Sequence, residues 1–278
     1  AVSAVYQTGK YIEESAKSNP VAVYQQPTSG DNNVLVFKQS GLIIPNAVPE
    51  ELTNATIEFW MRSDLNRSYV DQLGPGWGTF LFHTDNSGQL YAGWNTSSGD
   101  RMVINGIFKV GNWNHVAITI EGNKMIAYVN GTRKGSITSK SYSGLAAFGD
   151  LKMGHSGENQ FWQGAMDEFR LWKKALTPEE IKANMKNRVA FPAMQKDLLV
   201  YLTMDTIEVD GEIRMRELVS GKHAKMQTMG TWSTDINNDI LSETTVEHTA
   251  AIETPASSYT AGLPFTLAAS SSVDAVDW

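Results

Sequence analysis

Hydrophobic and polar positions alternate with a period of two in many short segments of the chain. In residues 55–62, Ile57, Phe59 and Met61 alternate with more polar neighbours, which is typical of a strand with one face in a core. Comparable strand-like segments lie at residues 33–37, 42–44, 78–84, 89–94, 102–108, 113–120, 124–129 and 198–205. Glycine- and asparagine-bearing turns separate them. The pattern predicts an all-β sandwich or barrel.

One segment carries the signals of a helix start instead. Thr177 stands at the N-cap position, Pro178 at the first helical position and Glu180 at the third, which is a capping box. Ile181 and Met185 then lie one turn apart on one face. We therefore predict one short helix that packs against the edge of the sandwich.

Composition narrows the range of functions. The chain has 278 residues, a formal net charge of −7 and no cysteine. The negative charge disfavours nucleic acid and anionic membranes as partners, and the lack of cysteine excludes disulfides, zinc–thiolate sites and thiol nucleophiles. No apolar run approaches the roughly 20 residues of a membrane-spanning helix, so no membrane-spanning segment is expected.

Five stretches in the same order resemble a known family. They are NVLVF with LIIP (33–45), ATIEFW (55–60), WNHVA with AYVNG (113–131), GAMDEFRLW with ALTPEEI (164–181), and LLVYLTM with SGKHA (198–224). Together they are similar to the LamG-like jelly roll of the concanavalin A-like lectin/glucanase superfamily. This resemblance implies a jelly-roll β-sandwich over residues 30–234, preceded by an N-terminal extension at 1–29.

Residues 235–278 are predicted to form a linker and part of a second domain. Residues 235–251 have the low-complexity composition of a linker, and residues 252–278 resemble the opening of an immunoglobulin- or PKD-like module. The resemblance implies a larger, multidomain surface protein of the kind found in gut Bacteroidetes. We therefore expect an extracellular or cell-surface location and a signal sequence that has been removed.

The sharpest catalytic candidate is Glu208-Val-Asp210-Gly-Glu212. Glycoside hydrolases of the same superfamily use a Glu-x-Asp-x-Glu strand, in which Glu208 and Glu212 would be the nucleophile and the acid/base. The alternative is that Asp210-Gly211 forms a hairpin turn, because Asp-Gly is a strong turn signal and glycine weakens a strand. The turn is the favoured interpretation.

Asp167 is the candidate metal ligand. Regular alternation places it on the same side as Phe169 and Leu171, where a carboxylate needs hydrogen-bond donors or a cation. The carboxylate suits Ca²⁺, which many relatives bind, but no calcium-loop motif is present. No cofactor is otherwise expected, and calcium stays open.

A glycan-binding surface needs exposed aromatic rings beside polar groups, because the C–H faces of sugars stack on the rings. The segment 64–78 is predicted to be a long irregular loop of the sort that carries binding residues. The predicted ligand-binding residues are Tyr69, Trp77, Trp94, Arg101, His155, Glu158 and Trp162. His83 and Asp71 are polar neighbours of this group.

The leading hypothesis is a non-catalytic extracellular carbohydrate-binding or adhesion module whose partner is a glycan or a surface protein. One alternative is a glycoside hydrolase or lyase of the same superfamily, which requires Glu208 and Glu212 to face one cleft. Another is a structural protein–protein spacer in a surface protein.

Overall fold

The computed structural model describes residues 5–8, 11–14, 32–64, 70–76, 80–84, 88–94, 99–157, 160–190, 192–227 and 231–237. The chain forms two compact units, one of residues 31–242 and one of residues 1–30 with 243–278. In the second unit, strands β1 (Val5–Thr8) and β2 (Tyr11–Glu14) pair antiparallel as a hairpin.

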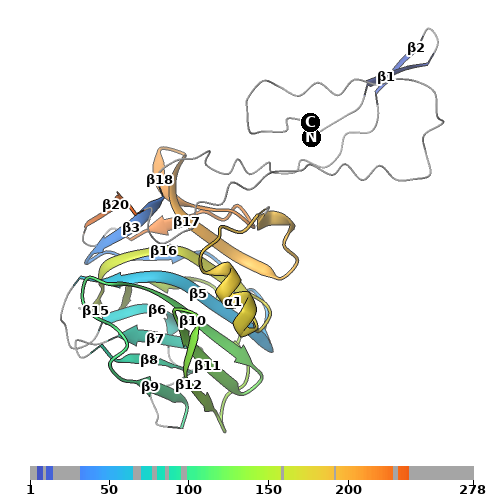
Figure 1. The fold of residues 1–278 in the computed structure, drawn as a ribbon. Helices are drawn as coiled ribbons and strands as arrows, with labels where there is room; N and C mark the ends of the chain where they lie inside the picture. Colours follow the sequence, from blue (N-terminus) through green and yellow to red (C-terminus); the bar gives the residue numbers. More distant parts are fainter. Residues whose placement is uncertain are drawn as a thin grey trace. The chain divides into compact units, whose positions relative to one another are not determined.

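The unit of residues 31–242 has two antiparallel layers (Figure 1). The first layer contains β12 (Thr132–Thr138), β11 (Lys124–Val129), β10 (Trp113–Glu121), β5 (Asn54–Ser63), β16 (Gln163–Trp172), β3 (Asn33–Lys38) and β20 (Thr231–Ile236). The first half of β16, residues 163–166, pairs with β3. The second half, residues 169–172, pairs with β17 (Leu198–Val209).

The second layer contains β4 (Leu42–Ile44), β13 (Leu151–Met153), β6 (Val70–Gly76), β7 (Phe80–Thr84), β8 (Leu90–Gly93) and β9 (Arg101–Ile104). The ladder passes from the first layer into the second through β17, β18 (Glu212–Glu217) and β19 (Ala224–Met226). A small hairpin of β14 (His155–Gly157) and β15 (Gln160–Phe161) lies against β6.

The core lies between the layers. Ile57, Phe59 and Met61 of β5 are buried there, which confirms the predicted alternation. The Phe59 ring meets the Phe82 ring of the opposite layer edge-on, with the ring centroids 5.2 Å apart. Aromatic pairs of this geometry add to the free energy of burial, so these two rings join the layers at the centre of the sandwich.

The capping box of the predicted helix is confirmed. In α1 (Pro178–Asn184) the Thr177 hydroxyl accepts a hydrogen bond from the Glu180 backbone N–H, and the Glu180 carboxylate accepts one from the Thr177 backbone N–H. A short 3₁₀ helix, η1 (Pro192–Met194), follows. Among the described residues, no helix has the length and apolar character needed to cross a bilayer.

The structure corrects two predictions about segments. The segment 64–78 is not an irregular loop throughout, because β6 occupies Val70–Gly76 and pairs with both β7 and β13. The predicted linker from residue 235 begins later, because β20 continues to Ile236 in register with β3. Residues 238–278, including the predicted C-terminal module, lie outside the described residues.

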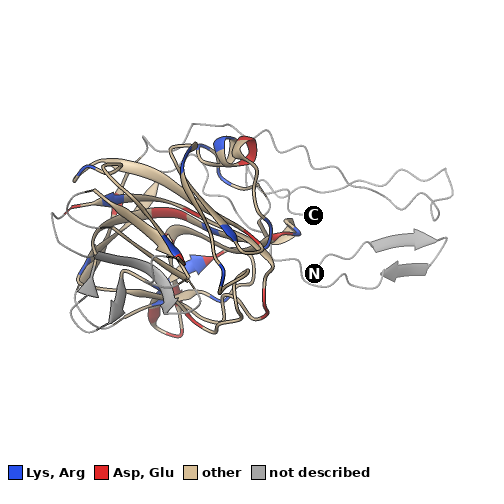
Figure 2. Ribbon diagram, turned by 90° about the horizontal axis from the view of Figure 1, so that it is seen from below, with Lys and Arg blue, Asp and Glu red and all other residues tan. Residues whose placement is uncertain are grey.

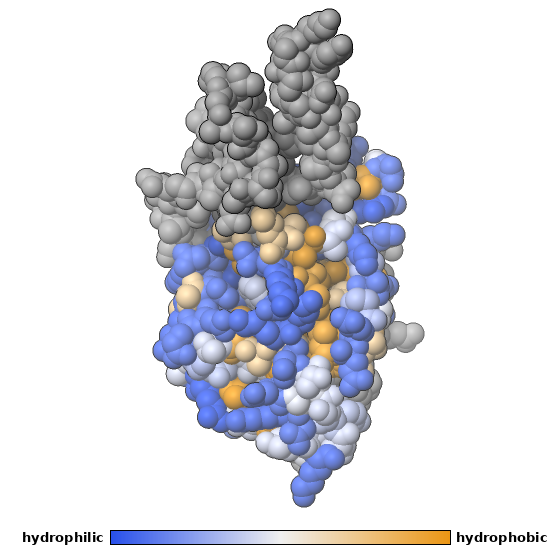
Figure 3. All heavy atoms as spheres, turned by 90° about the vertical axis from the view of Figure 1, so that its right-hand side faces the viewer, coloured by the Kyte–Doolittle hydropathy of each residue, from blue (hydrophilic) through white to orange (hydrophobic). Residues whose placement is uncertain are grey.

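Charged residues of both signs are spread over the coloured ribbon in Figure 2. On the face drawn in Figure 3, hydrophilic residues form most of the surface and hydrophobic residues show in a narrower strip between them. Such a mixture is the ordinary surface of a folded domain, so neither view by itself marks a binding site.

Candidate functional site

Helix α1 and the residues that follow it pack on part of the outer face of the first layer, over β5 and β16, and not against the edge of the sandwich as predicted (Figure 1). The Trp60 indole N–H donates to the Met185 carbonyl at 2.7 Å, and the Arg170 guanidinium donates to the carbonyls of Asn184 at 2.8 Å and Asn187 at 2.7 Å. These carbonyls lie at the end of the helix, where no intrahelical partner remains. The contacts hold the helix end on this face.

A buried charge network lies beneath this cover. Arg170 pairs with Glu168 at 2.5 Å and lies 3.5 Å from Glu58, and all three side chains are buried. The Tyr201 hydroxyl donates to Glu168 at 2.5 Å, and the Trp172 indole N–H donates to Glu58 at 2.9 Å. Burial raises the pKa of Glu58, although Arg170 opposes the shift. The network acts as a scaffold, because α1 and its own pairs enclose it.

Asp167 belongs to this outer face, which corrects the predicted orientation. Register shifts between Asp167 and Arg170, so that Glu168 and Phe169 together oppose Phe59 alone, and Glu168 takes a positive φ of 52°. This is a β-bulge, which adds a residue and interrupts alternation. Asp167 therefore pairs with Trp60 on the outer face, while Phe169 points into the core.

Both carboxylate oxygens of Asp167 are engaged. Oδ1 accepts from the Glu168 backbone N–H at 2.7 Å, and Oδ2 accepts from the Asn32 side-chain amide at 2.6 Å. Burial and the neighbouring Glu168 carboxylate raise the pKa of Asp167 well above its ordinary value. Across the described part of the chain no group of three potential ligands gathers around a metal position.

The outer face of the second layer presents a different set of side chains. On β7, β8 and β9 the residues Phe82, Leu90 and Met102 point inward, so their neighbours in sequence point outward. Residues paired across β7, β8 and β9 form two rows on this face. The first row is His83, Tyr91 and Val103, and the second is Leu81, Gly93 and Arg101. Val103 is 44% exposed, and His83 and Arg101 are half-buried.

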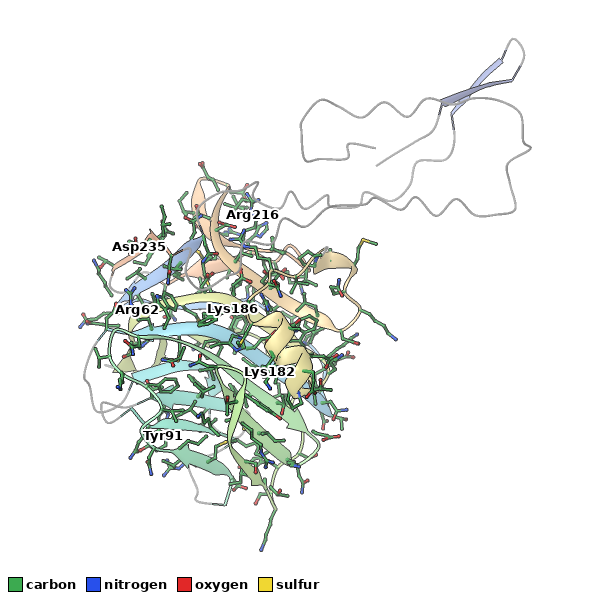
Figure 4. The ribbon with its side chains drawn as sticks, in the orientation of Figure 1. Arg62, Tyr91, Lys182, Lys186, Arg216 and Asp235 are labelled. Atoms are coloured by element: carbon green, nitrogen blue, oxygen red, sulfur yellow. The ribbon has the colours of Figure 1, made fainter. Side chains whose placement is uncertain are left out.

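His83, Tyr91 and Arg101 form one cluster, called here the Tyr91 cluster. The His83 and Tyr91 rings have centroids 4.5 Å apart, and the Arg101 guanidinium carbon lies 5.3 Å from the Tyr91 ring centroid. The Tyr91 hydroxyl donates to the Gln89 side-chain oxygen. In Figure 4, Tyr91 lies on the layer of β6 to β9, whereas Lys182 and Lys186 lie on the α1 side.

The backbone beneath Arg101 needs a glycine. A Cβ atom built on Gly93 would lie 2.3 Å from the Asp100 carbonyl oxygen and 2.6 Å from the Arg101 Cβ. Glycine inside a strand often marks such a close approach of two backbones. Gly93 thus lets β9 lie close enough to β8 for Arg101 to reach over Tyr91.

Two of the predicted aromatic residues are buried rather than exposed. Trp94 is 1% exposed and donates from its indole N–H to the Gly144 carbonyl at 2.6 Å. Trp162 is 0% exposed and packs on Phe37, with centroids 5.3 Å apart. Proximity to loops was a poor guide, because Trp94 continues the inward side of β8. Neither indole offers an open face to a sugar.

The remaining predicted residues are placed only in part. Arg101 is in the Tyr91 cluster. His155 lies in β14, but its side chain is outside the described residues, as are Tyr69, Trp77 and Glu158. Tyr69 directly precedes β6 and Trp77 directly follows it, and β6 pairs with β7, which carries His83. Tyr91 was not among the predicted residues, although alternation in β8 places it on the face opposite to Leu90 and Ala92.

The candidate catalytic carboxylates do not face one another. Asp210 and Gly211 both have positive φ, 54° and 79°, and form the two-residue turn between β17 and β18. Glu208 pairs with Ile213 and Val209 pairs with Glu212. Directly opposed residues share a face and successive residues alternate, so Glu208 and Glu212 point to opposite faces. The predicted hairpin turn is confirmed, and the alternative prediction of a catalytic Glu-x-Asp-x-Glu strand is wrong.

Known proteins share this fold. A family model described as the concanavalin A-like lectin/glucanases superfamily matches residues 38–182. A Bacteroides ovatus protein proposed to bind carbohydrate matches with a TM-score of 0.62 and 17% identity, covering 83% of this chain and 68% of its own. The native heptameric SAP-like pentraxin of Limulus polyphemus matches with a TM-score of 0.50 and 14% identity, covering 76% of this chain and 97% of its own. No curated protein matches the sequence.

Proposed function

The chain belongs to the concanavalin A-like lectin/glucanase superfamily, and we propose that it is a non-catalytic, extracellular carbohydrate-binding module. A fold of this type hosts several functions, so function depends on the side chains that the surface presents. The sandwich has two outer faces, and α1 with the residues after it covers the part of the first face around Trp60 and Arg170. The second carries the Tyr91 cluster, which is the surface proposed to bind the glycan.

The observation that carries the proposal is the half-buried His83 and Arg101 held on either side of Tyr91, beside the exposed Val103. Sugar hydroxyls need fixed polar partners, and sugar C–H faces need apolar contacts. This face offers both on rigid strands rather than on loops. Tyr69 and Trp77, which flank β6, remain in the proposal as residues that stack on the sugar.

The positions of Glu208 and Glu212 do not support the hydrolase alternative. Retaining glycosidases need two carboxyl groups about 5 Å apart on one side of the substrate, but Glu208 and Glu212 occupy opposite faces of a hairpin. The buried Glu58 and Glu168 are enclosed beneath α1 and are tied to Arg170. Binding is therefore the function that the described surface supports best.

A glycan array followed by calorimetry tests the proposal. We expect the protein to bind at least one soluble oligosaccharide, and Arg101→Ala to weaken that binding by about tenfold or more, as loss of a charged hydrogen-bond donor does. Arg133→Ala is the matched control, because Arg133 is exposed on β12 and its side chain bonds to the Ser136 hydroxyl. The proposal would be refuted if the protein bound no glycan on a broad array, or if the two variants weakened binding equally.

A further inference from the structure

The arginines of the described chain differ in whether a carboxylate neutralises them. Arg62 donates to both oxygens of Asp64, at 2.7 and 3.0 Å. Arg170 and Arg188 both face Glu168. The Arg101 guanidinium lies over the Tyr91 ring, and within the described part of the chain no carboxylate pairs with it. Desolvated charges are normally paired. Among the described residues the half-buried Arg216 also lacks a carboxylate partner, and Arg101 differs from it in lying over an aromatic ring.

The nearest acid in sequence does not neutralise Arg101. Asp100 precedes it directly, so the two side chains point to opposite sides of the chain. The Asp100 carboxylate is buried and accepts a hydrogen bond from the Ser139 hydroxyl at 2.5 Å. The guanidinium is thus left as a positive charge on the outer face of β9.

The position of this charge is fixed before any ligand arrives. The guanidinium lies over the Tyr91 ring, the His83 ring of the neighbouring strand β7 also packs on Tyr91, and the Gln89 side-chain oxygen accepts a hydrogen bond from the Tyr91 hydroxyl. Gly93 lets the two strands approach closely at this point. An arginine that is already oriented loses little conformational entropy when it forms its hydrogen bonds.

From these observations we propose that the Tyr91 cluster selects a glycan that carries an anionic group, and that Arg101 binds that group. This inference rests on the proposed glycan-binding function and names the class of ligand for the same surface. The planar fork of arginine matches two oxygens of a carboxylate or a sulfate at once, whereas a sugar hydroxyl offers it a single acceptor.

The charge of the whole protein limits how acidic the ligand is. The net charge of −7 repels a dense polyanion at long range. The Tyr91 cluster contains a single guanidinium, which complements one negative group. The site therefore suits an oligosaccharide with a single acidic sugar or a single sulfate ester, not a highly charged polymer.

The test uses the full chain on an array of neutral glycans, each beside its singly carboxylated and singly sulfated derivative. Two of the sets are xylotetraose with and without one glucuronic acid, and lactose with and without a 3′-sulfate. Calorimetry then gives the affinities of any set that binds. We expect the acidic member to bind at least about tenfold more tightly than its neutral partner. The carboxylate and sulfate members decide which anion is preferred.

Arg101→Gln should remove this preference and leave weak binding of the neutral partner, while Arg133→Gln should change neither. Equal affinity for neutral and acidic partners in the unaltered protein would overturn the inference and leave the glycan-binding proposal standing. A preference that survives Arg101→Gln would overturn the role of Arg101. No binding to any glycan on the array would overturn both proposals together.

Discussion

His115 lies on the outer face of β10, in contact with the charge network. Its ring meets the Trp60 ring edge-on at 5.5 Å, and its Nε2 lies 3.6 Å from Glu58 Oε2. Burial, with the positive charges of Arg170 and Lys186, lowers the pKa of His115 to about 3. The folded protein therefore holds this imidazole neutral at every pH above that value.

This shift predicts how stability depends on pH. Between pH 6.5 and 3 the unfolded chain binds a proton at His115 and the folded protein does not, so acidification favours unfolding. The stabilisation that the buried, neutral His115 contributes is complete above pH 6.5. Between pH 6.5 and about 3 the free energy of unfolding falls by up to about 1.4 kcal/mol for each pH unit of acidification. Glu58 has a raised pKa and acts in the opposite sense, so His115 has to be isolated by a variant.

Urea unfolding of the native protein and His115→Gln between pH 4 and 7 makes the comparison. We expect the difference in the free energy of unfolding between the two proteins to shift in favour of the variant as the pH falls. A difference that stays constant over this range would mean that His115 is protonated equally in both states. Measurement by NMR of the His115 pKa in the folded protein provides a direct check.

At the scale of elements, α1 depends on its surroundings. It has seven residues, and isolated helices of that length are unstable in water. The capping box stabilises its start, and Arg170 and Trp60 bind the carbonyls at its end. Arg170 thus connects a helix that is local in sequence to a network that spans β5, β16 and β17.

Arg170→Gln should therefore lower the free energy of unfolding by about 3–5 kcal/mol, because it leaves Glu58 and Glu168 buried without their cation. Arg214→Gln is the control, since Arg214 pairs with the exposed Glu212 on a hairpin, and such a pair contributes about 1 kcal/mol or less. Denaturant unfolding followed by circular dichroism measures both. Similar losses in the two variants would show that the buried network does not hold α1.

At the scale of the whole molecule, residues 31–242 contain one continuous core. The last described strand, β20, pairs with β3 along its full length, and Trp232 packs against the core. The strand comes from the far end of this unit, so it closes an edge of the sandwich that the preceding segments leave open. The predicted boundary at residue 234 would cut through it.

We expect a fragment of residues 31–242 to fold by itself, with a single cooperative thermal transition. A fragment ending at residue 230 should melt at a clearly lower temperature, because it loses the hydrogen bonds of β3 and the burial of Trp232. Thermal unfolding by circular dichroism compares the two. Equal melting temperatures would show that β20 adds nothing to the sandwich.

The sequence by itself determined the features that depend on neighbours along the chain. The alternation of Ile57, Phe59 and Met61, the capping box at Thr177 and the turn at Asp210-Gly211 were all predicted and are all present. Each follows from the backbone geometry of a few consecutive residues. For the same reason, the β-sandwich class could be predicted before the structure.

Only the tertiary structure decided which side chains are available for binding. Trp94 and Trp162 became core residues because segments distant in sequence pack on them, with Gly144 against Trp94 and Phe37 against Trp162. Asp167 changed faces because a bulge opposite Phe59 broke the alternation. Arg101 met Tyr91 because three strands align in register and Gly93 lets two of them approach. These outcomes depend on contacts between separate strands, and the pattern within one strand does not contain them.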